Sequence, residues 1–377
     1  SRPREKGGKG KSTDKLYRNN GDNTFTNVSE EAGILIEGYG LGVAISDIDQ
    51  DGWPDIYVAN DFLSNDLLYI NNRDGTFSNQ IADRLRHQSF NAMGVDLADF
   101  NNDALVDIAV LDMMPPDNFR QKNMFSPTEN YDLYFSNLSK GYEPQVVRNT
   151  LQLNNGNGSF SEIGQLAGIY QTDWSWAPLF ADFDNDGWKD LLVSNGYGKD
   201  ITDMDFVDYS RSLGPFQTPE ERKKLLLDRI AQLGEVKIPN YNYKNKGDLT
   251  FQDMSREWGI THAAISNGAA FADLDQDGDL DLVLNNLNES AFLYENQLNP
   301  GKEESKAKAN YLNINLKGSA KNTDGIGAKI HLFYSSEKGQ ERQYREHYPG
   351  RGYKSFVDQQ IHFGLGGISE IDSLQVI

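Results

Sequence analysis

The chain of 377 residues contains no cysteine, so no disulfide framework can staple the fold, and the redox compartment cannot be read from the sequence. It also lacks any run of about 18 apolar residues, which excludes a membrane-spanning helix. No signal peptide is recognisable at its start. Because the chain begins with Ser1 and stops at Ile377 within an expected strand, we expect a processed piece of a longer protein.

Histidine is scarce, and acidic residues outnumber basic ones. None of the 5 histidines lies beside an expected nucleophile, so no Ser/His/Asp constellation stands out and we do not expect an enzyme. The chain has 36 Lys and Arg against 56 Asp and Glu, which gives a formal net charge of −20 and argues against a nucleic-acid partner.

Much of this acidity lies in a nine-residue loop that occurs four times: DIDQDGWPD from 47, DFNNDALVD from 99, DFDNDGWKD from 182 and DLDQDGDLD from 273. Each copy places carboxylate or amide side chains at positions 1, 3, 5 and 9, and the position 7 carbonyl adds another oxygen. Such all-oxygen sets suit Ca²⁺, which takes six to eight oxygens at about 2.3–2.6 Å. The predicted ligands are Asp47, Asp49, Asp51, the Trp53 carbonyl and Asp55; Asp99, Asn101, Asp103, the Leu105 carbonyl and Asp107; Asp182, Asp184, Asp186, the Trp188 carbonyl and Asp190; Asp273, Asp275, Asp277, the Asp279 carbonyl and Asp281.

A solvated acidic turn is the alternative interpretation of one such loop, but four copies favour a metal site. An EF-hand needs a Glu at position 12, where these loops have Val58, Val110, Val193 and Leu284. Short apolar segments flank each loop, for example 42–45 before the first and 56–58 after it. We therefore predict that each loop is the turn of a β-hairpin.

The loops belong to a longer repeat. An LYxNN-type segment and a Thr/Ser-Phe pair precede each loop, and the Phe stands 22 residues before the first Asp every time. The loops are 52, 83 and 91 residues apart, which indicates a unit of about 52 residues with insertions in the second and third links. Four short strands per unit favour propeller blades over a solenoid. We predict an all-β chain with about four propeller blades over 16–299.

Three other segments interrupt or flank the repeats. Residues 1–15 are basic and Gly-rich, as expected for a linker or mobile segment. The insertion 113–145 is rich in Met, Phe, Tyr and Pro. The insertion 199–240 contains an expected helix, with Thr218 as N-cap, Pro219 in the first turn and Gly234 as the stop. Long insertions on a repeat scaffold either carry binding or cover the scaffold, and both interpretations stay open.

From residue 310 the acidic pattern ends. Segments 312–316, 328–334 and 359–363 alternate as half-buried strands do, and Gly-rich turns separate them. We predict a small antiparallel β domain over 310–377 that is cut at its last strand.

These residues resemble known families. The acidic repeats resemble the FG-GAP/VCBS blades of integrin α-subunit heads. The tail resembles the ASPIC/UnbV domain through NTDGIGA at 322–328, RGYKS at 351–355 and HFGLG at 362–366. The combination is similar to CRTAC-type proteins and to surface proteins of Bacteroidetes, and it covers 16–377. The resemblance implies bound calcium and an extracellular or cell-surface location (outer-membrane-associated in a bacterium). It also implies a propeller of about seven blades, of which the missing ones are expected upstream of Ser1.

The second loop departs from the pattern, because it has Asn101 in place of Asp and Ala104 in place of Gly. Fewer carboxylates lower calcium affinity, so we expect the Asp99 site to be the weakest of the four.

Two functional classes remain. The first is a calcium-stabilised binding or adhesion module that meets a protein or glycan through 113–145 and 199–240; association with a membrane surface stays open. The second is a polysaccharide lyase or hydrolase on a calcium propeller, which a cluster of Arg, Lys and carboxylates at the channel would favour. We expect the binding module, because the insertions concentrate aromatic residues typical of interfaces: Phe119, Phe125, Tyr131, Tyr134, Phe135 and Phe216.

Overall fold

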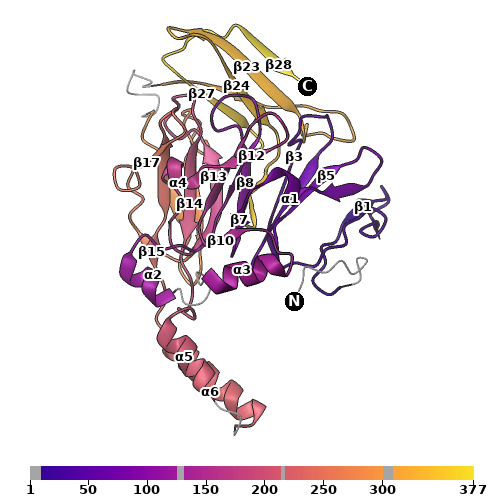
Figure 1. The fold of residues 1–377 in the computed structure, drawn as a ribbon. Helices are drawn as coiled ribbons and strands as arrows, with labels where there is room; N and C mark the ends of the chain where they lie inside the picture. The colour runs from indigo at the N-terminus through magenta and orange to yellow at the C-terminus, as the bar shows by residue number, and fades with distance from the viewer. Residues whose placement is uncertain (1–9, 125–130, 214–216, 300–308) are drawn as a thin grey trace.

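The computed structural model describes residues 10–124, 131–213, 217–299 and 309–377. Figure 1 shows β-sheets that stand side by side, a second β domain across their upper end and helices at their lower end. Strands carry the architecture and the helices are confined to connections, so the predicted all-β class is confirmed. Most of the expected linker, residues 1–9, lies outside the described residues.

Three sheets have four antiparallel strands each, built from two consecutive hairpins. The first hairpin has the acidic loop as its turn, which confirms that prediction, and the LYxNN-type segment opens the second hairpin. A blade therefore begins at the acidic-loop hairpin. The strands are β3 (Gly40–Ser46), β4 (Asp55–Asn60), β5 (Leu67–Asn71) and β6 (Phe77–Asn79); β8 (Val95–Ala98), β9 (Asp107–Val110), β11 (Thr150–Asn154) and β12 (Phe160–Glu162); β13 (Ser175–Ala181), β14 (Asp190–Asn195), β16 (Tyr241–Asn245) and β17 (Phe251–Asp253).

Two further sheets are partial blades. The fourth acidic-loop hairpin, β19 (Ser266–Ala272) with β20 (Asp281–Asn286), gains a single strand, β21 (Phe292–Tyr294). At the other end, β1 (Tyr17–Asn19) pairs only with β2 (Phe25–Asn27), in the pattern of a second hairpin. Within the described ranges the sheets do not close into a ring.

Hydrophobic clusters fill the spaces between neighbouring blades. One joins Tyr57 of the first complete blade to Val110 of the second, and the next two continue in the same way to β20. Every residue of β13 and β14 is buried, because a blade covers each face of that sheet; this is why those strands have apolar runs without alternation. The end blade differs: Val43 and Ile45 on β3 are 58% and 43% exposed.

The insertions form helices at the lower end of the blades (Figure 1). Residues 113–145 contain α2 (Asn118–Met124) and α3 (Tyr131–Ser139), which the absence of a periodic pattern did not predict. Residues 199–240 contain α5 (Met204–Ser212) and the predicted helix, α6 (Pro219–Gln232). Thr218 caps α6 through a reciprocal capping box with Glu221, as its sequence implies. The remaining short elements are α1 (Ile81–Arg84), α4 (Gly164–Ala167), β7 (Gln88–Ser89) with β10 (Gln145–Val146), and β15 (Ile238–Pro239) with β18 (Ala263–Ala264).

The C-terminal β domain has its own small core. Along β23, buried Ile330, Leu332 and Tyr334 alternate with more exposed residues, as predicted for a half-buried strand. They pack against Phe363 and its neighbours on β27. The strands are β22 (Asn310–Ile314) with β27 (Ile361–Gly366); β24 (Gly339–Glu346), β23 (Lys329–Ser336) and β28 (Ser373–Val376); and β25 (Gly350–Arg351) with β26 (Ser355–Phe356).

The short β25–β26 hairpin of this domain reaches in between the blades. It contacts the first strands of four sheets, β3, β8, β13 and β19. The backbone N–H of Val95 donates to the Gly352 carbonyl at 3.3 Å, and the Tyr353 ring packs on Trp176 with centroids 4.9 Å apart. The C-terminal domain, and not an insertion, therefore occupies the axis around which the blades are arranged.

Candidate metal centres

The four acidic loops share one backbone conformation. The glycines at position 6 have φ between 92° and 94°, and Ala104 adopts φ 64° in the second loop. Position 4 is also left-handed, which the sequence analysis missed, although an amide residue stands there in every copy and Asn is enriched in this region. These residues, with φ between 55° and 63°, are Gln50, Asn102, Asn185 and Gln276.

Carboxylates at positions 1 and 9 organise each loop. In the first loop, the backbone N–H groups of Asp51 and Gly52 donate to the two oxygens of Asp47, at 2.9 and 2.7 Å. The Ile48 N–H donates to Oδ2 of Asp55 at 3.0 Å, and the equivalent position 9 contact recurs in all four loops. The spacing seen in the sequence is therefore also the spacing that fixes the turn.

The first asparagine of each LYxNN-type segment forms hydrogen bonds with the acidic loop of the same blade. Its backbone N–H donates to Oδ1 of the position 9 aspartate, for example from Asn245 to Asp190 at 2.9 Å. Its side-chain amide donates to the carbonyl of Lys189 in its own loop and to that of Phe100 in the loop of the preceding blade, at 3.0 and 2.8 Å. In the sequence, this asparagine is recognisable only as a marker of the repeat. The equivalent residues are Asn71, Asn154 and Asn296.

Position 4 links each loop to the next. The Asn102 amide donates to the Gly187 carbonyl at 3.0 Å, and the Asn185 amide to the Gly278 carbonyl at 2.9 Å. Gln50 makes the same contact with the Ala104 carbonyl. The four loops thus form a hydrogen-bonded series across the blades.

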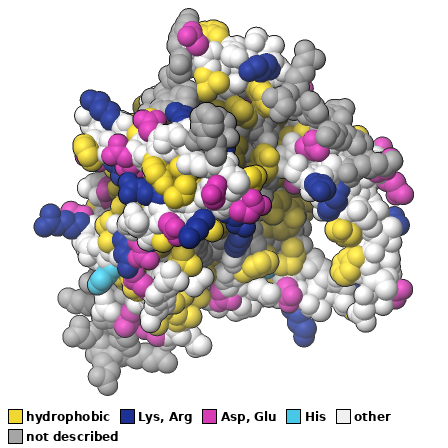
Figure 2. Space-filling model, turned by 90° about the horizontal axis from the view of Figure 1, so that it is seen from below, with side chains coloured by type: hydrophobic (Ala, Val, Ile, Leu, Met, Phe, Trp, Pro, Cys, Tyr) yellow, Lys and Arg dark blue, Asp and Glu magenta, His cyan; other side chains and the backbone are white. Residues whose placement is uncertain are grey.

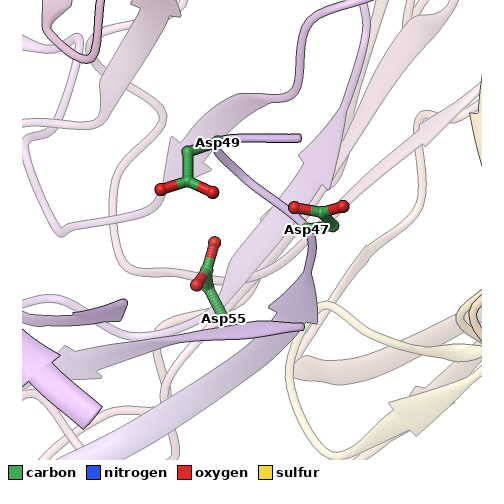
Figure 3. A group of neighbouring side chains, drawn as sticks. All are labelled: Asp47, Asp49 and Asp55. Atoms are coloured by element: carbon green, nitrogen blue, oxygen red, sulfur yellow. The ribbon is translucent and has the colours of Figure 1, made fainter. Parts of the chain in front are cut away.

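Three of the loops bring carboxylates together. Oxygens of Asp47, Asp49 and Asp55 lie within 4.8 Å of one another, and Figure 3 shows these carboxylates facing a common space. The other two clusters are Asp182, Asp184 and Asp190, and Asp273, Asp275 and Asp277. In the first and third loops the position 5 residue stands outside the cluster. For the second loop, the described part of the chain shows no such group. The position 7 carbonyls stay a prediction.

Basic side chains meet several of these carboxylates. Asp51 pairs with Arg73 at 2.7 Å, and Lys329 of the C-terminal domain contacts Asp47. In the third loop, Lys244 contacts Asp184 and Asp186.

The clusters have the electrostatics of cation sites. Burial, together with neighbouring carboxylates, raises the pKa of both Asp55 and Asp182 to about 7. One oxygen each of Asp49, Asp184 and Asp273 is buried without a hydrogen-bond partner. Buried oxygens that repel one another and lack donors fit a hard divalent cation, so the residues present suit calcium.

The second loop has a different environment. The Asn101 amide donates to Asp103 at 2.9 Å, and the ammonium of Lys189, in the third loop, donates to the Asp99 carbonyl at 2.6 Å. Lys189 is only 3% exposed. A buried positive charge next to the loop repels a calcium ion. This is a further reason to expect the weakest calcium site in the Asp99 loop.

Each acidic loop also contacts the C-terminal domain, which the spacing of the loops in the sequence does not predict. In the third loop the Gly366 N–H donates to the Asn185 carbonyl at 2.6 Å, and His362 bridges the Asn185 and Asn313 side chains. Burial lowers the pKa of His362 to about 3, so this histidine is neutral. A Cβ on Gly364 would lie 2.0 Å from Asp182, which explains the glycine in HFGLG. The other loops contact Glu346, Arg342 and Asn313.

Comparison with known families agrees with this architecture. The FG-GAP-like repeat model matches residues 8–58, 47–110 and 131–193, and the ASPIC and UnbV model matches 318–377. The chain combines FG-GAP-like repeats with an ASPIC/UnbV domain. The fourth acidic loop, at 273–281, lies outside the matched ranges but repeats the contacts of the other three at positions 6 and 9.

No curated protein matches this FG-GAP and ASPIC/UnbV chain. Among solved structures, one similar chain belongs to a pore form of the Photorhabdus luminescens Tc holotoxin. The identity is 12%, the TM-score is 0.29, and the match covers 88% of this chain but 12% of that one. Within the described residues, we find no helix with the length and apolar character needed to cross a membrane.

Proposed function

We propose that this FG-GAP and ASPIC/UnbV chain is a calcium-stabilised binding module of the cell surface or extracellular space, and that its insertions bind a protein partner. The observation that carries the proposal is the separation of the two ends of the blades. The C-terminal domain covers the acidic-loop end, and the helical insertions lie at the opposite end (Figure 1). The partner surface is therefore sought on the insertions.

The insertion end carries exposed apolar side chains. Phe119 on α2 is 73% exposed, and Phe135 on α3 is 47% exposed. On α6, Leu225 and Leu227 are 36% and 55% exposed, and no residue of this helix is buried. Figure 2 views this end from below and shows hydrophobic patches among charged side chains. Such mixed surfaces suit a protein partner. Of the other aromatic residues named from the sequence, Phe125 and Phe216 lie outside the described residues.

The two insertions are joined to each other and to the blades. Arg120 on α2 contacts Asp173 and pairs with Asp200 of the second insertion at 2.9 Å. The backbone groups of Tyr197 and Val236 pair at 3.0 and 2.8 Å at the base of the second insertion. The Tyr197 ring stacks on Trp174 with centroids 3.7 Å apart. These contacts support a single partner surface built from both insertions.

A polysaccharide-degrading enzyme is less well supported. A cluster of Lys189, Arg345, Arg351 and Asp96 does lie at the axis, which is the feature that would favour the enzyme. The C-terminal domain covers much of it, however, and leaves a cavity of about 70 Å³. A polysaccharide cannot enter so small a space, so the cluster does not favour the enzyme.

The test is a deletion that spares the base of the insertion. Replacing residues 203–232 by a short Gly/Ser linker keeps the Tyr197–Val236 pair and the Arg120–Asp200 ion pair. We expect calcium binding and the melting temperature to stay close to wild type, while binding to surface proteins of the source organism is lost.

A point variant sharpens this test. Leu225→Ser with Leu227→Ser should weaken partner binding without unfolding. Leu166→Ser, which changes an equally exposed leucine of α4 elsewhere on the blades, should have no effect. Equal binding by the deletion and the wild type, or loss of the fold in the deletion, would contradict the proposal.

A further inference from the structure

A small cavity lies between the blades and the C-terminal domain. Its volume is about 70 Å³, and it is walled on the blade side by β3, β8 and Lys189 and on the other side by residues 344–351 and 357–361. The side chains that matter for its chemistry are Asp96, Lys189, Tyr344, Arg345, Glu346 and Arg351.

The guanidinium of Arg345 has no ion-pair partner among the described residues, although the charges of Asp182 and Asp96 act on it from farther away. Its Nε and Nη2 atoms are buried without a hydrogen-bond partner, and no carboxylate of the described residues lies within ion-pair distance. The Phe363 ring packs against the guanidinium, with its centroid 5.4 Å from Cζ. Arg351 in the same wall, by contrast, is held by both oxygens of Asp96 at 2.7 and 2.6 Å. A buried charge without a partner is strongly unfavourable, so Arg345 calls for an anion.

The carboxylates around the cavity already accept hydrogen bonds; Asp99, which also lines it, accepts from the Asp103 and Ala104 N–H groups at 3.1 and 3.0 Å. Asp96 is occupied by Arg351 and by the Phe180 N–H at 2.7 Å. Glu346 accepts from Ser46 and from the Asp47 N–H at 3.2 Å. Asp358, which also lines the cavity, is exposed and accepts from the Gln359 N–H.

Donors are in surplus in the same wall. The Tyr344 hydroxyl is buried without a partner. Lys189 donates only to a neutral carbonyl, that of Asp99. Burial lowers the pKa of Arg345 to about 10; the charges of Asp182 and Asp96 oppose this shift, and the nearby Arg351 charge adds to it. A guanidinium without an ion-pair partner, an unpartnered hydroxyl and a lysine that donates to a neutral carbonyl therefore line one cavity.

We propose that this cavity binds a small oxyanion, such as sulfate or phosphate, on the fork of the Arg345 guanidinium, with Tyr344 and Lys189 as further donors. The guanidinium fork matches two oxygens of such an ion. A water molecule needs at least about 10–15 Å³ of such volume, so the cavity holds roughly five waters, the space of an ion with five heavy atoms. Because its walls come from both domains, the anion joins the C-terminal domain to the blades.

Thermal melting in sulfate tests the site in the intact, calcium-loaded chain. At constant ionic strength, replacing chloride by sulfate should raise the melting temperature saturably, by about 2 °C for each tenfold increase above Kd. Arg345→Gln should abolish the rise, and Lys321→Gln, which removes an exposed positive charge of the same domain, should retain it. An equal rise in Arg345→Gln would overturn the proposal.

Crystals of the wild type grown with selenate decide the matter even if Arg345→Gln does not fold. An anomalous peak beside Arg345 supports the site, and a cavity filled only by ordered water refutes it. Parallel melts with phosphate in calcium-poor buffer and with acetate separate a tetrahedral oxyanion from a carboxylate. A response to acetate alone would overturn the assignment to a tetrahedral ion.

Discussion

Arg351 offers the sharpest test of how the two domains are held together. Its guanidinium forms a two-pronged ion pair with Asp96, whose side chain is only 2% exposed, across 255 residues of sequence. Its Cζ atom also lies 5.8 Å from the centre of the Phe271 ring in the fourth blade. The variant Arg351→Met keeps much of the apolar contact and removes the charge.

The magnitude follows from burial. Removing one partner of a buried ion pair costs about 3–5 kcal/mol, because the remaining charge stays desolvated without compensation. Asp96 would keep only the Phe180 N–H and backbone donors on its own strand. Burial already raises the pKa of Asp96 against the opposing effect of Arg351, and the variant should raise it further. Adding Asp96→Asn removes the orphaned charge, so the double variant should recover roughly 1–4 kcal/mol.

Urea unfolding followed by circular dichroism and by tryptophan fluorescence measures these differences. Trp176, which packs on Tyr353 of the β25–β26 hairpin, reports on the domain contact. Lys317→Met, an exposed cation of the same domain, serves as control and should change stability by less than about 0.5 kcal/mol. A loss below about 1 kcal/mol in Arg351→Met, or a double variant as unstable as the single one, would refute the reasoning.

Other predictions concern the loops and the buried acids. Chelation by EDTA should lower the melting temperature, because each occupied calcium site contributes about 2.7 kcal/mol at a hundredfold excess over Kd; an unchanged melt would contradict calcium binding. Ala104→Gly should stabilise the protein by up to about 1 kcal/mol. Glycine relieves the left-handed strain of about 1–2 kcal/mol, which exceeds the cost of losing one buried methyl group, about 0.8 kcal/mol. A lower melting temperature of the variant would contradict this. Burial raises the pKa of Asp66 to about 7 from 3.8, so the folded protein holds a proton that the unfolded chain releases, and stability falls as pH rises from about 4 to 7. The destabilisation of Asp66→Asn relative to wild type should therefore be smaller at pH 7.5 than at pH 5.5, by roughly 2 kcal/mol in urea unfolding, and a constant difference would count against a raised pKa.

The features that could be predicted from the sequence are local in the chain. The nine-residue spacing predicts the hairpin turn because the aspartates at positions 1 and 9 accept hydrogen bonds from backbone N–H groups of the same loop, as Asp47 and Asp55 do. The capped start of α6 was predictable because Thr218 and Glu221 are three residues apart. Left-handed Ala104 follows from its place in the repeat. In each case a few neighbouring residues determine the conformation.

Only the tertiary structure decided which contacts join these segments to one another. Asn245 marks a repeat in the sequence, but its bond to the Phe100 carbonyl, 145 residues away, joins two blades. In the sequence, RGYKS is only a motif of the tail. The fold pairs Arg351 with Asp96 and places the β25–β26 hairpin on the blade axis. The unpaired guanidinium of Arg345 is likewise visible only in three dimensions. The physical reason is that hydrogen bonding and burial depend on distance in space, which the packing of blades sets and local spacing does not.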